Sequence, residues 1–293
     1  MTPHSLLVTG VSGHLGRLAA HQLLLDRPQG VSLRGCTRTP DRAAALAERG
    51  MAVIAADFDD PASLDRAVDG VDGLLLVSTG AEHAGPVRVR QHLAALAAAR
   101  RAGVGHVVYT SLQRADDSPL RALVADHAAT EAALPPRRTV LRNAFYMEMV
   151  LATLPPAIRS GRFVTAAGAG RIAYVARADC ARVAAQALRR PDDAPPRLEV
   201  SGAESFDAHA LVDVANAVLG TSIVVEAVPP DELAARLVAG GQPPALAAVL
   251  AGLDRGVAAG AMAAVHGDVA AFTGTPPIPL AGFLAAHRGV LTG

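Results

Sequence analysis

Apolar positions in the first half of the chain follow two alternating patterns. Short runs that are apolar throughout are followed by longer segments in which apolar residues recur every three or four positions. The first pattern is typical of strands buried on both faces of a sheet, and the second is typical of helices with one buried face. The expected strands are residues 6–9, 31–36, 52–56, 73–78, 106–110 and 139–142, and the expected helices are residues 14–25, 41–49, 61–68, 87–102 and 120–134.

This alternation predicts an α/β fold in which residues 1–144 form a Rossmann-type doubly wound parallel sheet. The rhythm changes after that point. A helix over 146–154 is expected to end at the pair Pro155-Pro156, because proline disrupts a helix interior. Beyond it we expect a helix at 178–190 and strands at 197–201 and 223–228. Residues near 173–202 should therefore return to the sheet, while residues 145–172 and 203–293 form a smaller C-terminal α/β lobe on the substrate side.

The basic residues change what chemistry is possible. All 27 residues counted as Lys plus Arg are arginine, so the chain contains no lysine. This excludes a Schiff base, the lysine of a phosphate-binding loop and a Tyr-x-x-x-Lys catalytic pair. The formal net charge is zero and no long basic run occurs, which argues against direct binding of nucleic acid.

The two cysteines, Cys36 and Cys180, provide neither a disulfide framework nor metal-ligand spacing. We interpret them as buried small hydrophobic residues and expect a cytoplasmic protein without a metal site. Charged residues interrupt the alanine-rich segment 244–272, and no apolar run reaches about 18 residues. No membrane span is therefore expected.

The segment VTGVSGHLG, residues 8–16, lies between the first strand and the first helix. Its spacing, T-G-x-x-G-x-x-G, is typical of short-chain dehydrogenases. Gly10 permits the tight turn, Gly13 lets the backbone approach a pyrophosphate, and Gly16 lets the helix pack closely on the strand. Free N–H groups at the start of the helix would then face the phosphates, so the sequence predicts a dinucleotide site.

Doubly wound sheets bind ligands beyond the carboxyl ends of their strands. The second strand ends at Arg38 and lacks the acidic residue that usually binds the ribose of NAD. Arg38 could be an exposed residue at a helix start, but its fork of donors also suits a 2′-phosphate, so we expect NADPH in preference to NADH. Asp57 and Phe58 would then flank the adenine. The remaining strand ends carry Ser78, Thr79, Thr110, Ser111 and Asn143.

A linear series of segments resembles the NmrA-like branch of the atypical short-chain dehydrogenase/reductases, and within it the bacterial NAD(P)H:quinone reductases. The segments are VTGVSGHLG, TRTPDRAAAL, ADFDDPASL, LLLVST, AGVGHVVYTSL, ADHAATE, LRNAFYMEM and AAGAGRIAYVARADCA. The resemblance thins out after about residue 230. It implies NADPH in a cleft between a Rossmann domain and a small lobe, a quinone as hydride acceptor, and no need for flavin or metal.

The resemblance also implies roles for individual residues. Gly10, Ser12, Gly13, His14, Leu15 and Gly16 would hold the pyrophosphate, and Arg38 the 2′-phosphate. Ser78 and Thr79 would edge the nicotinamide, with Thr110 and Ser111 beneath its ribose. His127 falls where related reductases often carry a lysine. The substrate pocket would include Asn143, Phe145 and Tyr146.

Without lysine, the reaction would depend on placing NADPH against an electron-poor quinone, with the proton coming from water, Tyr146 or His127. Asn143, Tyr146 and His127 are thus the candidate catalytic residues. Other interpretations remain open. His127 could form a surface pair with Glu131 four residues later, and Phe145 and Tyr146 could be plain core residues.

Two other functions are compatible with the sequence. The protein could be a non-catalytic NAD(P) sensor that acts through a protein partner, since the NmrA-like family includes such sensors. It could also be a biosynthetic reductase of an enone or polyketide quinone, because small Ala and Gly residues would let a bulky ring enter. A homodimer is possible in either case.

Overall fold

The computed structural model describes residues 4–27 and 29–293. Seven parallel strands form the main sheet, and the chain runs from its middle to one edge before returning to build the other half. In spatial order the strands are β3 (Ala52–Ala55), β2 (Ser32–Thr37), β1 (Ser5–Thr9), β4 (Gly73–Leu76), β5 (His106–Leu112), β6 (Arg138–Asn143) and β8 (Arg197–Val200). The direction of the order reverses between β1 and β4, which is where such sheets bind ligands. The predicted Rossmann-type fold is confirmed.

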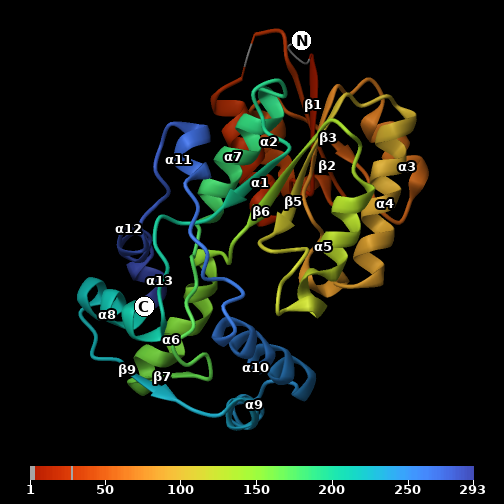
Figure 1. The fold of residues 1–293 in the computed structure, drawn as a ribbon. Helices are drawn as coiled ribbons and strands as arrows, with labels where there is room; N and C mark the ends of the chain where they lie inside the picture. The colour runs from red at the N-terminus through yellow and green to blue at the C-terminus, as the bar shows by residue number, and fades with distance from the viewer. Residues whose placement is uncertain (1–3, 28) are drawn as a thin grey trace.

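Helices cover both faces of the sheet (Figure 1). One face carries α1 (His14–Leu25), α2 (Ala44–Glu48) and α7 (Arg177–Arg189). The other carries α3 (Pro61–Val68), α4 (Pro86–Arg101) and α5 (Arg121–Ala133). The core is aliphatic, and every residue of β4 is buried, as expected for a strand covered on both sides. Short alanine side chains bring α1 and α7 close to the sheet and to each other.

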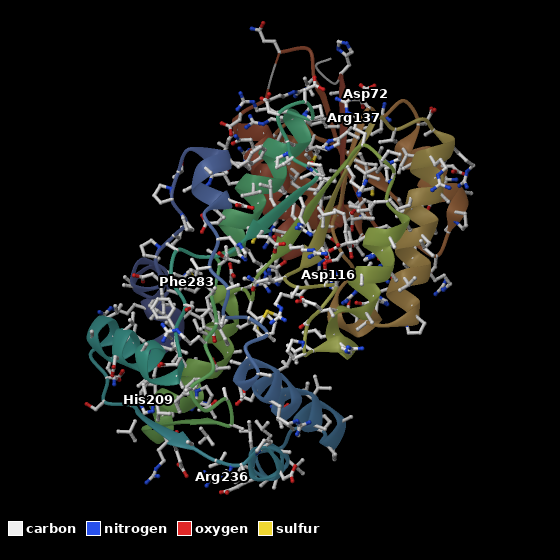
Figure 2. All side chains as sticks on the ribbon, viewed as in Figure 1. Asp72, Asp116, Arg137, His209, Arg236 and Phe283 are labelled. Carbon is white, nitrogen blue, oxygen red and sulfur yellow. The ribbon has the colours of Figure 1, made fainter. Side chains whose placement is uncertain are left out.

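A second hydrophobic core lies in the C-terminal lobe, at the lower left of Figure 1. Its elements are α6 (Val150–Ser160), β7 (Arg162–Thr165), α8 (Ala208–Leu219), β9 (Val224–Ala227), α9 (Pro230–Ala239), α10 (Pro244–Ala258), α12 (Leu280–Ala286) and α13 (Arg288–Thr292). Figure 2 places His209 and Arg236 in this lobe, far from Asp72 and Arg137 at the opposite end of the molecule. One segment leaves the lobe: α11 (Asp268–Thr273) packs on α7, and its Asp268 accepts a hydrogen bond from the Glu199 N–H (2.8 Å).

The prediction that a helix ends at Pro155-Pro156 is wrong. A single 3₁₀ turn, Met147–Met149, leads into α6, which continues through both prolines to Ser160. Proline has no backbone N–H to donate, and a proline in a helix interior costs about 3 kcal/mol of helix stability. Leu154 and Ala157 are almost fully buried against the lobe core, and this packing keeps the helix intact across the prolines.

The sequence pattern also missed a strand. β7 lies in a Gly-rich stretch and pairs in parallel with β9, about 60 residues later. Neither strand belongs to the main sheet, so the lobe has a small sheet of its own. Among the described helices, none is long and apolar enough to cross a membrane.

Candidate active site

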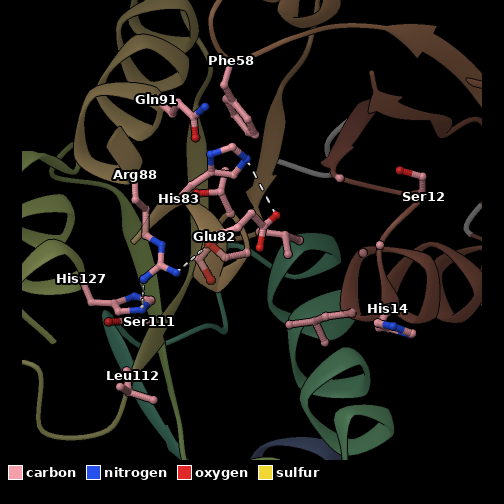
Figure 3. Close-up of a pocket in the computed structure, with 18 of the residues that line it drawn as sticks. Ser12, His14, Phe58, Glu82, His83, Arg88, Gln91, Ser111, Leu112 and His127 are labelled. Atoms are coloured by element: carbon pink, nitrogen blue, oxygen red, sulfur yellow. Dashed lines mark hydrogen bonds and ion pairs between the residues drawn. The ribbon is translucent and has the colours of Figure 1, made fainter. Parts of the chain in front are cut away.

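A cavity of about 670 Å³ opens at the carboxyl edge of the sheet, with walls from both the sheet and the lobe. Most of the residues predicted from the sequence lie in its wall: Gly10, Ser12, Gly13, His14, Leu15, Gly16, Arg38, Asp57, Phe58, Ser78, Thr79, Ser111, His127, Phe145 and Tyr146. Figure 3 shows Ser12 and His14 on one side of the cavity and Ser111 and His127 on the other. Two predicted residues, Thr110 and Asn143, lie behind the wall and are each 1% exposed.

The glycine loop has the geometry of a phosphate-binding turn. Gly10 has φ +64°, and its carbonyl accepts a hydrogen bond from the Gly13 N–H (2.9 Å). A Cβ on Gly16 would lie only 2.4 Å from the Gly10 oxygen, so glycine is required where α1 crosses the loop. No side chain caps the start of α1, which leaves its first N–H groups available to an anion. These features fit a dinucleotide pyrophosphate.

The end of the cavity beside β2 and β3 carries the residues expected at the adenosine. Arg38 is exposed, and the described residues provide no carboxylate to pair with it. The hydroxyls of Ser12 and Thr37 lie 2.6 Å apart, which ties the glycine loop to the end of β2. Phe58 follows β3 and meets the edge of the His92 ring at 6.4 Å between centroids. A free guanidinium next to an aromatic wall suits a phosphorylated adenosine.

Three side chains hold the backbone that follows β4. The N–H groups of Val77 and Ser78 donate to the hydroxyls of Thr9 (2.9 Å) and Thr110 (2.8 Å). The Thr79 N–H donates to Nε2 of His92 (3.1 Å). Thr110 thus acts from behind the wall, by fixing the segment that faces the cavity.

A buried ion pair joins α4 to α5 at the cavity wall. Nη1 of Arg88 donates to Oδ2 of Asp126 at 2.8 Å, and the two side chains are only 6% and 2% exposed. The pair also binds both ends of one loop, because Arg88 donates to the Gly80 carbonyl (3.0 Å) and Asp126 accepts from the Gly85 N–H (2.8 Å). Neither residue was predicted from the sequence.

His127 is buried beside this pair, 7% exposed. Its Nε2 lies 3.3 Å from Nη1 of Arg88 and its Nδ1 lies 2.9 Å from the Tyr109 hydroxyl. Burial, and then the charge of Arg88, lower the pKa of His127 to about 4. The alternative in which His127 forms a surface pair with Glu131 is therefore wrong.

Glu131 instead supports Ser111. The Ser111 hydroxyl donates to Oε1 of Glu131 (2.5 Å), and Oε2 of the same carboxylate binds Nη2 of Arg142 (2.7 Å). Arg142 is also held by Asp116, at 3.0 Å, which Figure 2 labels in the middle of the molecule. Because its hydrogen is used by Glu131, Ser111 presents only lone pairs to the cavity.

The lobe side of the cavity is mostly apolar, with Phe145, Met149 and Leu253 in its wall beside Tyr146. The Tyr146 hydroxyl accepts a hydrogen bond from Nδ2 of Asn143 (3.3 Å), which leaves its own hydrogen free to donate. Burial raises the pKa of Tyr146, so the phenol keeps its proton. The Arg177 guanidinium stands 4.6 Å above the ring centroid.

Both cysteines are free and buried, as the sequence indicated. Burial raises the pKa of Cys36 to about 12, so it does not behave as a reactive thiolate. Burial likewise raises the pKa of Cys180. Among the residues that the structure describes, no group of three or more His, Cys, Asp or Glu could hold a metal ion.

The chain resembles known proteins over nearly all of its length. Residues 10–191 match a family model described as NAD(P)H-binding. The chain is 35% identical over 260 residues to quinone oxidoreductase 2 of Escherichia coli (strain K12). The aligned residues make up 88% of this chain and 89% of that protein. The chain belongs to the NmrA-like family of NAD(P)H-dependent oxidoreductases.

Two further comparisons agree with this membership. A structure of the NADPH-dependent quinone oxidoreductase QOR2 from Escherichia coli, complexed with NADPH, matches with a TM-score of 0.87 and 32% identity, over 96% of this chain and 99% of that chain. A (4-alkanoyl-5-oxo-2,5-dihydrofuran-3-yl)methyl phosphate reductase of Streptomyces griseus is 30% identical over 289 residues, or 96% of this chain and 97% of that protein.

Proposed function

We propose that this protein is an NADPH-dependent reductase that passes hydride directly to a quinone, without flavin or metal. The observation that carries the proposal is one continuous cavity. Its glycine-loop end suits a dinucleotide, and its other end is an apolar wall that contains a protonated phenol, Tyr146. The similarity to quinone oxidoreductase 2 supports a quinone as the acceptor.

The preference for NADPH over NADH rests on Arg38. No acidic residue stands at the end of β2, and the guanidinium is exposed at the cavity without a carboxylate partner among the described residues. An unpaired arginine can form charge-assisted bonds with a phosphate and gains nothing comparable from a ribose hydroxyl. We therefore assign the 2′-phosphate to Arg38.

NADPH supplies a hydride when bound, and a quinone that takes this hydride and one proton becomes a hydroquinone. The chain contributes placement: the glycine loop fixes the pyrophosphate, and Ser111 offers an acceptor to a hydroxyl of the nicotinamide ribose. Ser78 and Thr79 line the nicotinamide side, on a backbone held by Thr110 and His92. Such placement is the main source of rate when the acceptor is already electron-poor.

Tyr146 is our candidate proton donor to the quinone oxygen. Asn143 donates one hydrogen bond to the phenol oxygen, so the phenol hydrogen points away from Asn143. The Arg177 charge above the ring favours the phenolate that remains after transfer. Both nitrogens of His127 already have partners, so we assign His127 a positioning role and not proton donation.

A second candidate function is reduction of an enone that carries an acidic group. The Streptomyces griseus relative, named as a reductase of an unsaturated lactone phosphate, favours it. So does Arg177: besides its contact with the Tyr146 ring, its guanidinium has only a 3.9 Å ion pair with Glu148 and makes no hydrogen bond within the described residues. An uncommitted cation at the substrate end suits a phosphate or carboxylate.

Oxidation of NADPH by the purified protein, followed by the absorbance of the reduced nicotinamide, tests these assignments. The acceptors are a benzoquinone, a naphthoquinone, its sulfonate and an unsaturated lactone phosphate. Turnover well above the uncatalysed rate with the uncharged quinones supports the first proposal. Turnover only with the lactone favours the second. Tight NADPH binding without turnover on any acceptor would refute both and favour a sensor.

A further inference from the structure

The buried pair Arg88–Asp126 has no part in the reaction proposed above, yet its arginine forms part of the cavity wall. Figure 3 shows Arg88 between His127 and the loop that carries Glu82. A buried ion pair rarely adds net stability, because removing two charges from water costs about as much as their attraction returns. Its location beside the nicotinamide end therefore calls for a role in the site.

We propose that Arg88 is a positioning residue that fixes the tautomer of His127 and, together with Asp126, clamps the loop Gly80–Gly85 against the cavity. The inference rests on the proposed function for its activity readout alone. Its structural readouts do not require turnover.

The hydrogen-bond donors around His127 determine its tautomer. A guanidinium only donates hydrogen bonds, so Nε2 of His127, at 3.3 Å from Arg88 Nη1, must be the nitrogen that accepts. Its neutral ring then carries the hydrogen on Nδ1, where it faces the Tyr109 hydroxyl at 2.9 Å. Burial already disfavours the charged imidazole, and protonation of Nε2 would also set an N–H against the guanidinium, so Arg88 adds to burial in keeping the imidazole neutral.

The surrounding charges agree with this arrangement. His127 is faced by Arg88 and His92 from α4, by Tyr109 from β5, and by Asp126 and Glu131 from its own helix. Asp126 is already bound by the Arg88 guanidinium and by the backbone N–H groups of Gly85 and His127 (2.8 Å each). Glu131 is bound by Arg142 and Ser111. Each carboxylate thus has another partner. Both still act to raise the pKa of His127, but burial and the charge of Arg88 outweigh them.

The loop clamp uses the same two side chains. Arg88 binds the carbonyl at the start of the loop and Asp126 binds the N–H at its end, where Gly85 has φ +83°. Between them, the short helix Ala81–His83 brings Glu82 and His83 to the cavity wall. Loss of Arg88 should therefore affect the loop and the imidazole together.

The test compares Arg88→Gln, Arg88→Lys and the double variant Arg88→Gln/Asp126→Asn by NMR titration of the His127 ring. In Arg88→Gln the repulsive charge is gone and Asp126 has lost its counter-ion, so the pKa of His127 should rise by about one to three units. Arg88→Lys keeps the charge, and the double variant removes both charges. Arg88→Lys should leave the pKa low and the hydrogen on Nδ1. The double variant should also leave the pKa low, because burial still acts, but without the guanidinium the hydrogen should no longer be confined to Nδ1. The double variant has no buried unpaired carboxylate, so it tests the proposal if Arg88→Gln fails to fold.

The control is Arg90→Gln on the same helix, since Arg90 is 62% exposed and pairs with Asp59 at the surface. It should leave the His127 titration unchanged. In Arg88→Gln, kcat/KM for quinone reduction should fall about tenfold as the pH drops through the raised pKa. That pH transition should vanish in Arg88→Gln/His127→Asn. A His127 pKa in Arg88→Gln identical to that of the wild type, or a hydrogen still confined to Nδ1 in the double variant, would overturn the proposal, whether or not the protein reduces quinones.

Discussion

Replacing Arg38 with alanine tests which dinucleotide the cavity prefers. Arg38 is exposed, and no described carboxylate pairs with it, so its loss leaves no buried charge behind. The free energy of unfolding should change by no more than about 0.5 kcal/mol, as for other surface substitutions. The effect should instead fall on the cofactor that carries a 2′-phosphate.

The expected magnitude follows from the bond that is lost. A hydrogen bond to a charged group contributes about 1.5–3 kcal/mol, which corresponds to a change of about 10- to 150-fold in Kd. Arg38→Ala should therefore weaken NADPH binding by that factor and leave NADH binding within about twofold. Isothermal titration calorimetry or quenching of nicotinamide fluorescence would measure both constants on one preparation. Because the contact between Arg38 and the 2′-phosphate is ionic, the loss of NADPH affinity caused by Arg38→Ala should become smaller as salt is added.

Arg42→Ala provides the matched control, because Arg42 is a nearby exposed arginine that does not line the cavity. It should leave both dissociation constants unchanged. Equal weakening of NADPH and NADH by Arg38→Ala would refute the assignment, since a contact to the 2′-phosphate cannot affect a cofactor that lacks it.

Three other perturbations test the loop, the phenol and the buried histidines. Gly16→Ala sets a Cβ 2.4 Å from the Gly10 oxygen, so it should cost about 1–3 kcal/mol in urea unfolding and weaken NADPH binding. Tyr146→Phe should lower kcat about 10- to 100-fold while the Kd for NADPH stays unchanged, as stopped-flow kinetics would show. Burial lowers the pKa of His106 and His127 to about 4, so the free energy of unfolding should fall as pH drops from about 6.5 towards 4.

Each of these has an outcome that contradicts it. Gly289→Ala adds a Cβ with nothing within 4 Å, so a loss of stability equal to that of Gly16→Ala would contradict the steric argument. An unchanged kcat in Tyr146→Phe would leave water as the proton source. The sign of the pH effect follows from linkage, because the unfolded chain binds these protons first. Stability that stays flat over that window would contradict it, and His106→Gln should reduce the slope.

The sheet and the dinucleotide end could be predicted from the sequence because their determinants are local. A strand covered on both faces must be apolar throughout, as β4 is. A turn that approaches a pyrophosphate needs glycine at fixed spacing, and the clash that a Cβ on Gly16 would make with the Gly10 oxygen shows why. Elements that depend on residues far away in the sequence were harder to predict. β7 exists only because β9 pairs with it, and α6 continues past Pro155 only because Leu154 and Ala157 are buried by the lobe.

The charged groups around His127 could not be predicted for a related reason. Arg88 and Asp126 are 38 residues apart, on helices that also carry exposed arginines such as Arg90 and Arg121, and nothing local distinguishes a buried arginine from an exposed one. The adjacent Asp126-His127 dipeptide was the one available signal, and its helical spacing pointed to Glu131 instead. The packing of α4 against α5 determines which charged group His127 contacts, because it brings the Arg88 guanidinium within 3.3 Å of the imidazole. In a chain without lysine, the fixed positive charge at this end of the cavity has to come from an arginine. The fold supplies it from a different helix, so the sequence position of His127 alone does not reveal how its charge state is controlled.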